Sequence, residues 1–160
     1  MCGISAIISK NSFSKGPLEK MTDAIIHRGP DGYGYYYGPG IALGHRRLAI
    51  IDLSDAGHQP MEYLERYVIT YNGEIYNYLE IRQKLERDGY TFKSRTDTEV
   101  IMAAFDKWNT DCVHQFNGMW AFVIYDKKEN VIFCSRDRYG VKPFYYWAAP
   151  DQTVYFGSEI

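Results

Sequence analysis

Residues 119–125 are apolar at every position, whereas most other apolar runs of the chain are shorter and interrupted. A strand that is apolar on both sides is buried on both faces. Residues 3–9 and 67–71 have the composition of further buried strands, and 33–37 is aromatic and strand-like. The pattern therefore predicts two sheets packed against each other.

Three segments have helical signals. Pro17 suits the first turn of a helix that we expect to extend to about His27. Asn77 is a candidate N-cap for a helix that ends near Gly89. The sequence Thr-Asp-Thr-Glu at residues 96–99 is a capping-box pattern. The positions that follow it with helical spacing, and that should face the core, are Val100, Ile101, Ala104, Phe105 and Trp108.

Turn residues separate these elements. Asn72 and Gly73 both tolerate positive φ, so the sequence predicts that the strand at 67–71 stops there in a turn. Residues 41–52 indicate a strand that continues into irregular backbone, and 131–135, 144–147 and 154–156 are expected to complete a meander. Strands buried on both faces, with helices between them in the chain, indicate an α+β fold with helices outside two sheets.

Composition limits the kinds of partner. A chain of 160 residues with 46% hydrophobic residues is one globular domain by the usual prior. The net charge is −2 and the charges of both signs are interspersed, so neither nucleic acid nor an anionic membrane is expected as a partner. No run is long enough to span a bilayer, and no signal peptide is visible. We therefore expect a cytoplasmic protein in a reducing compartment.

The cysteines and histidines do not form a metal site. Cys2, Cys112 and Cys134 contain no CxxC pair and no even-numbered disulfide framework. The four histidines lack the spacing of metal ligands. Cys134 follows the apolar residues 131–133 and is expected to be a packed thiol. The sequence therefore predicts no metal.

Cys2 follows Met1 directly and has two interpretations. Loss of Met1 would give Cys2 a free α-amine, which titrates at roughly 7.7–8.0 and could act as the base for its own thiol. A base beside a nucleophile is what covalent acyl transfer requires. The alternative is a small hydrophobic residue in an early buried strand, and Met-Cys alone favours that alternative.

Other polar residues are compatible with a site that binds an amino acid. Arg47 could clamp a carboxylate with its planar fork, or could belong to a solvated face. Asn72 and Gly73 could form an oxyanion hole, or a simple turn. Asp97 could accept an ammonium group, or cap its own helix. Arg136-Asp137-Arg138 favours an internal salt-bridge network or a domain contact.

Taken together, the motifs make the chain similar to a known family. They are MCGI at 1–4, HRGPDG at 27–32, GHRRLAIID at 44–52, GHQPM at 57–61, YNGEIYN at 71–77, TDTEV at 96–100, FNGM at 116–119, RDR at 136–138 followed by GVKP at 140–143, and FGSE at 156–159. Residues 1–160 closely resemble the class II, N-terminal-nucleophile type of glutamine amidotransferase domain. The resemblance is strongest to the glutaminase half of glutamine-hydrolysing asparagine synthetases, and it implies a four-layer αββα sandwich of two antiparallel sheets between helices (Ntn-hydrolase-like).

The resemblance also implies roles. Cys2 would attack the side-chain amide of glutamine, and Asn72 and Gly73 would stabilise the oxyanion. Arg47 would bind the α-carboxylate. Asp97 with Glu74 would orient the amino end, and the backbone around Leu48, Ile50 and Ile51 would line the glutamine pocket.

The resembled enzymes carry a second, C-terminal domain, and we expect residues 1–160 to be part of such a longer two-domain enzyme. The resemblance implies that residues 1–160 need no cofactor. It also implies that the C-terminal synthetase domain uses ATP and Mg²⁺ to convert an acceptor, with aspartate to asparagine as the expected reaction. It also allows a homodimer of the full-length enzyme. The alternative is a non-catalytic glutamine-sensing or assembly module of a related amidotransferase.

Overall fold

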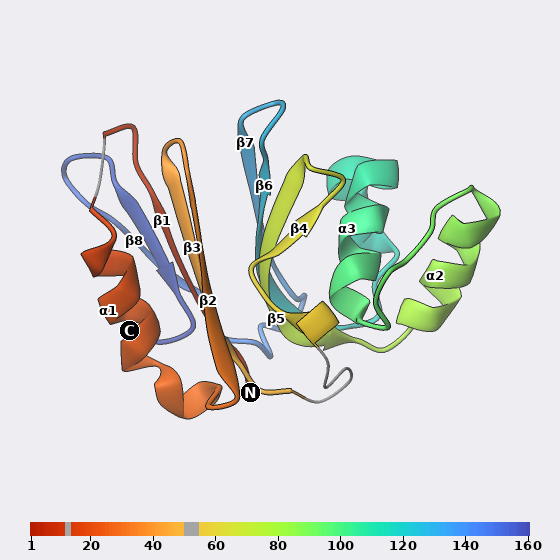
Figure 1. Cartoon of the computed structure of the whole chain (residues 1–160), viewed down its shortest axis with the longest axis horizontal. Helices are drawn as coiled ribbons and strands as arrows, with labels where there is room; N and C mark the ends of the chain where they lie inside the picture. Colours follow the sequence, from red (N-terminus) through yellow and green to blue (C-terminus); the bar gives the residue numbers. More distant parts are fainter. Residues whose placement is uncertain (12–13, 50–54) are drawn as a thin grey trace.

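The computed structural model describes residues 1–11, 14–49 and 55–160, and these form four layers (Figure 1). Helix α1 (Gly16–Ala24) covers one sheet, a second sheet packs against the first, and helices α2 (Tyr78–Arg87) and α3 (Asp97–Trp108) lie outside the second sheet. The expected αββα sandwich is confirmed.

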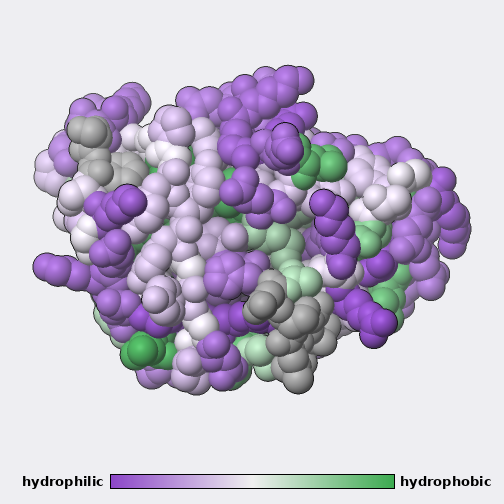
Figure 2. Space-filling view, in the orientation of Figure 1, coloured by the Kyte–Doolittle hydropathy of each residue, from purple (hydrophilic) through white to green (hydrophobic). Residues whose placement is uncertain are grey.

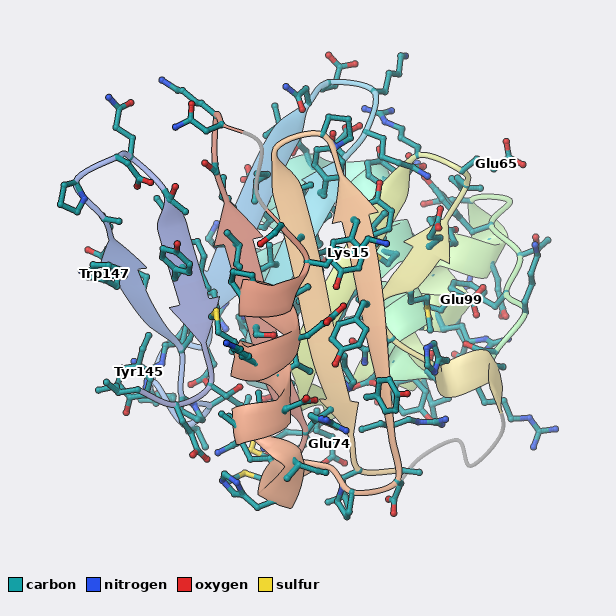
Figure 3. The ribbon with its side chains drawn as sticks, turned by 60° about the vertical axis from the view of Figure 1, so that its left-hand side comes forward. Lys15, Glu65, Glu74, Glu99, Tyr145 and Trp147 are labelled. Atoms are coloured by element: carbon teal, nitrogen blue, oxygen red, sulfur yellow. The ribbon has the colours of Figure 1, made fainter. Side chains whose placement is uncertain are left out.

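The first sheet is antiparallel, with the strand order β2-β3-β1-β9-β8. Its central strand is β1 (Gly3–Ile8), and its neighbours β3 (Ile41–Arg47) and β9 (Val154–Gly157) pair on either side. The edges are β2 (Gly32–Gly38) and β8 (Tyr145–Ala148). Helix α1 packs on β1 and β3 and leaves β8 uncovered, so that Tyr145 and Trp147 are exposed at the sheet edge (Figure 3).

The second sheet has the order β4-β5-β6-β7, also antiparallel. Its strands are β4 (Met61–Tyr63), β5 (Tyr67–Ile75), β6 (Gly118–Asp126) and β7 (Val131–Arg136). Seven consecutive residues of β6 are buried, which confirms the expectation of burial on both faces. One face packs on the first sheet and the other on α3, which is why the strand needs apolar residues at successive positions.

The expected meander at the end of the chain is wrong. Strand β7 pairs with β6, whereas β8 and β9 cross to the other sheet and β9 pairs with β1. Hairpin-like spacing in the sequence cannot reveal this, because β1 offers β9 a partner that is distant in the sequence.

The predicted turn at Asn72-Gly73 is also wrong. Strand β5 continues through both residues to Ile75, and Gly73 lies opposite Trp120 of β6. A Cβ atom on Gly73 would lie 2.3 Å from the carbonyl oxygen of Met119. The glycine is therefore needed for the close approach of two strands rather than for positive φ.

The helix ends follow the sequence with local differences. Helix α1 stops at Ala24, and a 3₁₀ turn η1 (Ile26–Arg28) follows it. Asn77 precedes α2, but its side chain bonds to backbone near Asn117 and does not cap the helix. Gly89 ends the helix with a φ of 94°. Two further 3₁₀ turns are η2 (Asp55–Gly57) and η3 (Asn109–His114).

The capping box at α3 is half formed. The Thr96 hydroxyl accepts from the Glu99 N–H at 3.2 Å, as predicted. The Glu99 carboxylate instead accepts from the N–H of Lys93 and of Ser94, so it braces the loop before the helix. This loop carries Asp97 into the interior.

The surface in Figure 2 is mostly hydrophilic, with small scattered apolar patches. No helix in the described part of the chain is long and apolar enough to cross a membrane.

Candidate active site

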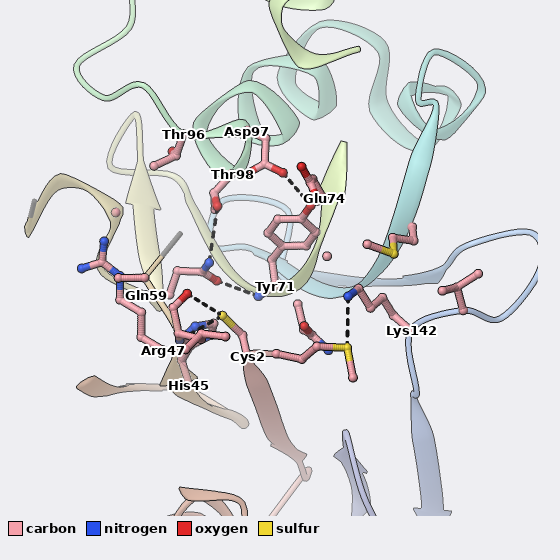
Figure 4. Close-up of a pocket in the computed structure, with 18 residues that line it drawn as sticks. Cys2, His45, Arg47, Gln59, Tyr71, Glu74, Thr96, Asp97, Thr98 and Lys142 are labelled. Atoms are coloured by element: carbon pink, nitrogen blue, oxygen red, sulfur yellow. Dashed lines mark hydrogen bonds between the residues drawn. The ribbon is translucent and has the colours of Figure 1, made fainter. Parts of the chain in front are cut away.

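A cavity of about 350 Å³ opens where the two sheets and α3 meet (Figure 4). Seven parts of the chain line it: the residues before β1, the end of β3 with the residues after it, the segment around η2, the end of β5, the start of α3, the start of β6 and the turn after β7. Of the residues singled out by sequence, the cavity brings together Cys2, Arg47, Leu48, Asn72, Gly73, Glu74 and Asp97. Ile50 and Ile51 lie outside the described residues.

Cys2 is half-buried just before β1. Because Gly3 pairs with Arg46 in the β1–β3 ladder, Cys2 lies beside residues 47 and 48. Its sulfur accepts the N–H of Leu48 at 3.3 Å, and the thiol donates to the Leu48 carbonyl at 3.6 Å. Its own carbonyl accepts from Arg28 Nε at 3.0 Å. The thiol is thus held by the backbone of a single residue, Leu48.

Burial raises the pKa of the Cys2 thiol. The Leu48 N–H, the chain's N-terminal charge, Arg47 and Lys142 oppose this effect but do not reverse it. The thiol is therefore the resting form at neutral pH, and its use as a nucleophile requires a base.

Asn72 points from β5 toward the first sheet. Thr70, two residues earlier on the same strand, reaches His45 and the Gly44 carbonyl on that side, and side chains two apart share a face. Asn72 is 2% exposed, and within the described residues its Nδ2 atom has no hydrogen-bond partner. A buried donor of this kind costs about 1–3 kcal/mol if it stays unpaired. The cavity therefore contains an amide donor that is ready for an acceptor.

The backbone N–H of Gly73 points away from β6. The N–H and the C=O of Trp120, which lies opposite Gly73, both bond to Asp137 on the far side of β6. The pair is thus not hydrogen-bonded, and the Gly73 N–H is directed to the open side of β5. On the same side of β5, the N–H of Tyr71 donates to Gln59 and the N–H of Ile75 donates to Asp97. Gly73 therefore presents its N–H between these two residues, both of which line the cavity.

Asp97 is the first residue of α3, and the N-cap residue before it is Thr96. One carboxylate oxygen accepts from the Tyr71 hydroxyl at 2.7 Å and from the Ile75 N–H at 3.0 Å. Burial raises its pKa, and these hydrogen bonds partly counter that shift. A buried carboxylate at a cavity wall is suited to a cationic group.

Arg47 and Glu74 supply charged groups to the cavity. Arg47 is half-buried and Glu74 is exposed, and both line the cavity. Together with Asp97 they offer a cation to a carboxylate and two carboxylates to an ammonium group, which are the two charged groups of a free α-amino acid.

Sequence reasoning missed His45 as a site residue. Its side chain is fully buried, and Nδ1 lies 3.3 Å from the Thr70 hydroxyl. That hydroxyl has one proton, which it donates to the Gly44 carbonyl, so Nδ1 must be the donor to Thr70. Burial lowers the pKa of His45 to about 3. His45 is therefore neutral, with Nε2 as an acceptor that has no partner within the described residues. The only sequence signal for His45 was its position near the end of an apolar strand.

Gln59 and Lys142 were also missed as site residues. The Gln59 amide accepts from the Tyr71 N–H at 2.7 Å and donates to Thr98 at 3.3 Å, so it joins β5 to α3. Lys142 is almost fully buried at the cavity wall. Only the motifs around them, and no periodicity, marked these positions.

The salt-bridge network expected at Arg136-Asp137-Arg138 is wrong. The Asp137 carboxylate accepts the N–H groups of Trp120, Tyr139, Val141 and Lys142. Arg136 and Arg138 donate to backbone carbonyls. Arg136 and Asp137 therefore brace the backbone of the turn, and Arg138 bonds to the carbonyls of Val113 and Phe116 before β6.

Within residues 1–11, 14–49 and 55–160, no three His, Cys, Asp or Glu side chains cluster in a way that could hold a metal ion.

The comparisons with known proteins agree with one another. A family model described as "Glutamine amidotransferase domain" matches residues 1–160. A putative glutamine-hydrolysing asparagine synthetase 2 of Methanocaldococcus jannaschii is 48% identical, over 100% of this chain and 34% of that protein. Asparagine synthetase 1 (glutamine-hydrolysing) of Bacillus subtilis is 41% identical, over 99% of this chain and 26% of that protein.

A solved structure has the same fold. Glutamine phosphoribosylpyrophosphate amidotransferase from B. subtilis superposes with a TM-score of 0.82 at 18% identity, over 98% of this chain and 42% of that one. The chain spans about a third or less of the length of the curated relatives just described.

Proposed function

The chain belongs to the glutamine amidotransferase domain family, and on that premise we propose that it hydrolyses glutamine to glutamate and ammonia through a thioester on Cys2. One observation carries the proposal: the Cys2 thiol lines the same cavity as Asn72, whose buried amide donor has no hydrogen-bond partner among the residues that the structure describes. The relatives at 41–48% identity bear names that describe glutamine-hydrolysing enzymes.

The chemistry begins with loss of Met1, which frees the α-amine of Cys2. That amine takes the thiol proton, and the sulfur attacks the δ-carbonyl carbon of glutamine. The carbonyl oxygen becomes an oxyanion, which accepts from Asn72 Nδ2 and the Gly73 N–H. The C–N bond then breaks, and the nitrogen leaves as ammonia with the proton returned by the amine. Water attacks the thioester, and glutamate leaves with the thiol restored.

The charged residues hold the amino-acid end. Arg47 pairs with the α-carboxylate, and Asp97 with Glu74 receives the α-ammonium group. Leu48 holds the thiol through its backbone, so it positions the nucleophile as well as lining the pocket. Recognition at both ends favours free glutamine over amides in peptides.

The ammonia would be used by a second domain of a larger protein. We propose that residues 1–160 are the glutaminase domain of a two-domain enzyme, because the named relatives are much longer. The second domain would be an ATP- and Mg²⁺-dependent synthetase, with aspartate as the acceptor and asparagine as the product. The glutaminase domain itself would need no cofactor, and the full-length enzyme could form a homodimer. A reducing cytoplasm would keep the Cys2 thiol usable.

Mass spectrometry of the purified chain is the first test, because retained Met1 blocks the α-amine. Glutamate release is then compared between the wild type and Cys2→Ala, which should fold normally and release none. Cys112→Ala is the matched control, since this thiol is buried in the core beside α3 and lies outside the cavity. Glutaminase activity that survives Cys2→Ala would refute the proposal.

A glutamine-analogue electrophile separates catalysis from mere binding. A catalytic domain gains the mass of the analogue on Cys2. Glutamine binding without any gain in mass would instead establish the non-catalytic sensing or assembly module.

A further inference from the structure

Lys142 is held at the cavity by a turn that the proposed mechanism leaves unexplained. Asp137 accepts four backbone N–H groups, the last of them from Lys142 itself at 2.9 Å. Arg136 donates to the carbonyls of Gly140 and Lys142, both at 2.7 Å. A turn braced this closely fixes the Cα position of Lys142, and hence where its side chain enters the cavity.

The side chain of Lys142 is unusually placed for a lysine. The residue is 5% exposed and lines the cavity, whereas lysine is almost never fully buried unless it is paired. Its Nζ atom donates to the sulfur of Met1 at 3.3 Å, and thioether sulfur is a weak acceptor. Figure 4 shows Lys142 on the side of Cys2 opposite Arg47.

Loss of Met1 removes that sulfur. Loss of Met1 also turns the peptide nitrogen of Cys2 into a free amine. Lys142 and Cys2 line the same cavity, and the two side chains interact electrostatically.

Other charged groups also surround Cys2 and Lys142. They are Arg28 and Arg47 as cations, Glu74 and Asp137 as carboxylates, and the hydroxyl of Tyr71. Asp137 is committed to four N–H groups, and Glu74 is exposed to water. Burial and the nearby Arg28 lower the pKa of Lys142, whereas Cys2, Glu74 and Asp137 raise it.

We propose that the buried ammonium group of Lys142 keeps the α-amine of Cys2 unprotonated once Met1 is removed, and so makes that amine available as the base. Lys142 is in this sense a positioning residue that acts through Cys2. The inference rests on the proposed glutamine hydrolysis, in which the amine takes the thiol proton.

The proposed mechanism requires an unprotonated α-amine on Cys2. With an ordinary pKa of roughly 7.8, only about a seventh of the α-amines would be unprotonated at pH 7. A neighbouring cation disfavours the protonated amine and therefore increases this fraction. The same cation favours the thiolate that forms when the proton moves. Both effects assist the attack.

The first test is the pH dependence of kcat/KM for glutamine in Lys142→Met, which keeps the length of the side chain and removes its charge. The ascending limb should move up by about one pH unit, so that activity at pH values below it falls about tenfold. Lys142→Arg keeps a charge that does not titrate, and should restore the limb. Lys127→Met removes a lysine outside the cavity and should change nothing.

An unmoved limb in Lys142→Met would overturn the inference. So would a Lys142→Arg enzyme as impaired as Lys142→Met, because that result assigns the role to a neutral lysine amine. Thermal unfolding of each variant verifies that it is folded.

A second readout does not depend on glutaminase activity. In a Cys2→Ser background the thiol no longer titrates, and the NMR chemical shift of Cα at residue 2 reports the α-amine alone. Adding Lys142→Met should raise the pKa of that amine by about one unit. An inactive wild type would sink the proposed function but leave this comparison valid, whereas an active wild type with equal amine pKa values would sink only the role of Lys142.

Discussion

Removal of the Asn72 side-chain amide tests the proposed oxyanion site most directly. Asn72→Ala deletes the donor, and Asn72→Asp replaces it with an acceptor of the same shape. One oxyanion donor is typically worth about 10²–10³ in kcat, or about 2.7–4 kcal/mol of transition-state stabilisation. The donor acts on charge that develops during the reaction, so kcat should fall by this factor while KM for glutamine changes little.

The structure adds a second expectation, on stability. Asn72 Nδ2 is buried and has no partner within the described residues, at a cost of about 1–3 kcal/mol. Its removal from the cavity wall relieves that cost and leaves no closed void, because the site is already open. The free energy of unfolding of Asn72→Ala should therefore equal or exceed that of the wild type. Removal of a polar group that only stabilises the fold would instead lower the free energy of unfolding.

The assay is steady-state glutamate release at saturating and limiting glutamine, alongside urea unfolding of the same preparations. Asn11→Ala, at an exposed asparagine outside the cavity, is the matched control. Two results would refute the reasoning: a kcat for Asn72→Ala within a few-fold of wild type, or a loss of activity accompanied by a loss of folding stability.

Two further predictions concern buried ionisable groups. In the folded protein the pKa of His45 is about 3, whereas in the unfolded chain it is near 6.5. The unfolded chain therefore binds a proton first as pH drops below 6.5, and the free energy of unfolding falls. Between pH 7 and pH 5 this one group should account for about 2 kcal/mol of the loss. In urea unfolding at the two pH values, His45→Asn should lose about 2 kcal/mol less than the wild type, with the exposed His114→Asn as control, and equal losses would contradict the burial argument. Asp97 is opposite in sign: burial raises its pKa, so the stability contributed by its protonated form is lost as pH rises through that pKa. Asp97→Asn should therefore be no less stable than the wild type at pH 7, whereas KM for glutamine should rise about 10- to 100-fold because the ammonium group loses a charged acceptor; an unchanged KM would remove Asp97 from the substrate site.

Local patterns were sufficient for most elements. The apolar run at 119–125 predicted a strand buried on both faces, and Thr96 predicted the start of α3, because burial period and capping depend on neighbouring residues. The same reasoning failed where a distant strand decided the outcome. Asn72-Gly73 has the composition of a turn, but pairing with β6 keeps both residues in β5.

The chain's order of residues is enough to reveal the groups that the chemistry needs: a thiol at position 2, an Asn-Gly pair, an arginine at the end of an apolar strand, and an aspartate at a helix start. The pairing of the strands in three dimensions brings Cys2, Asn72 and Asp97 to one cavity, directs the Gly73 N–H to the open side of β5, and places Lys142 on the wall of the cavity that holds Cys2. The reason is that sheet pairing joins residues from opposite ends of the chain. The pairing of a strand sets the direction of its backbone N–H groups, and the burial of a charge determines how strongly it interacts with its neighbours.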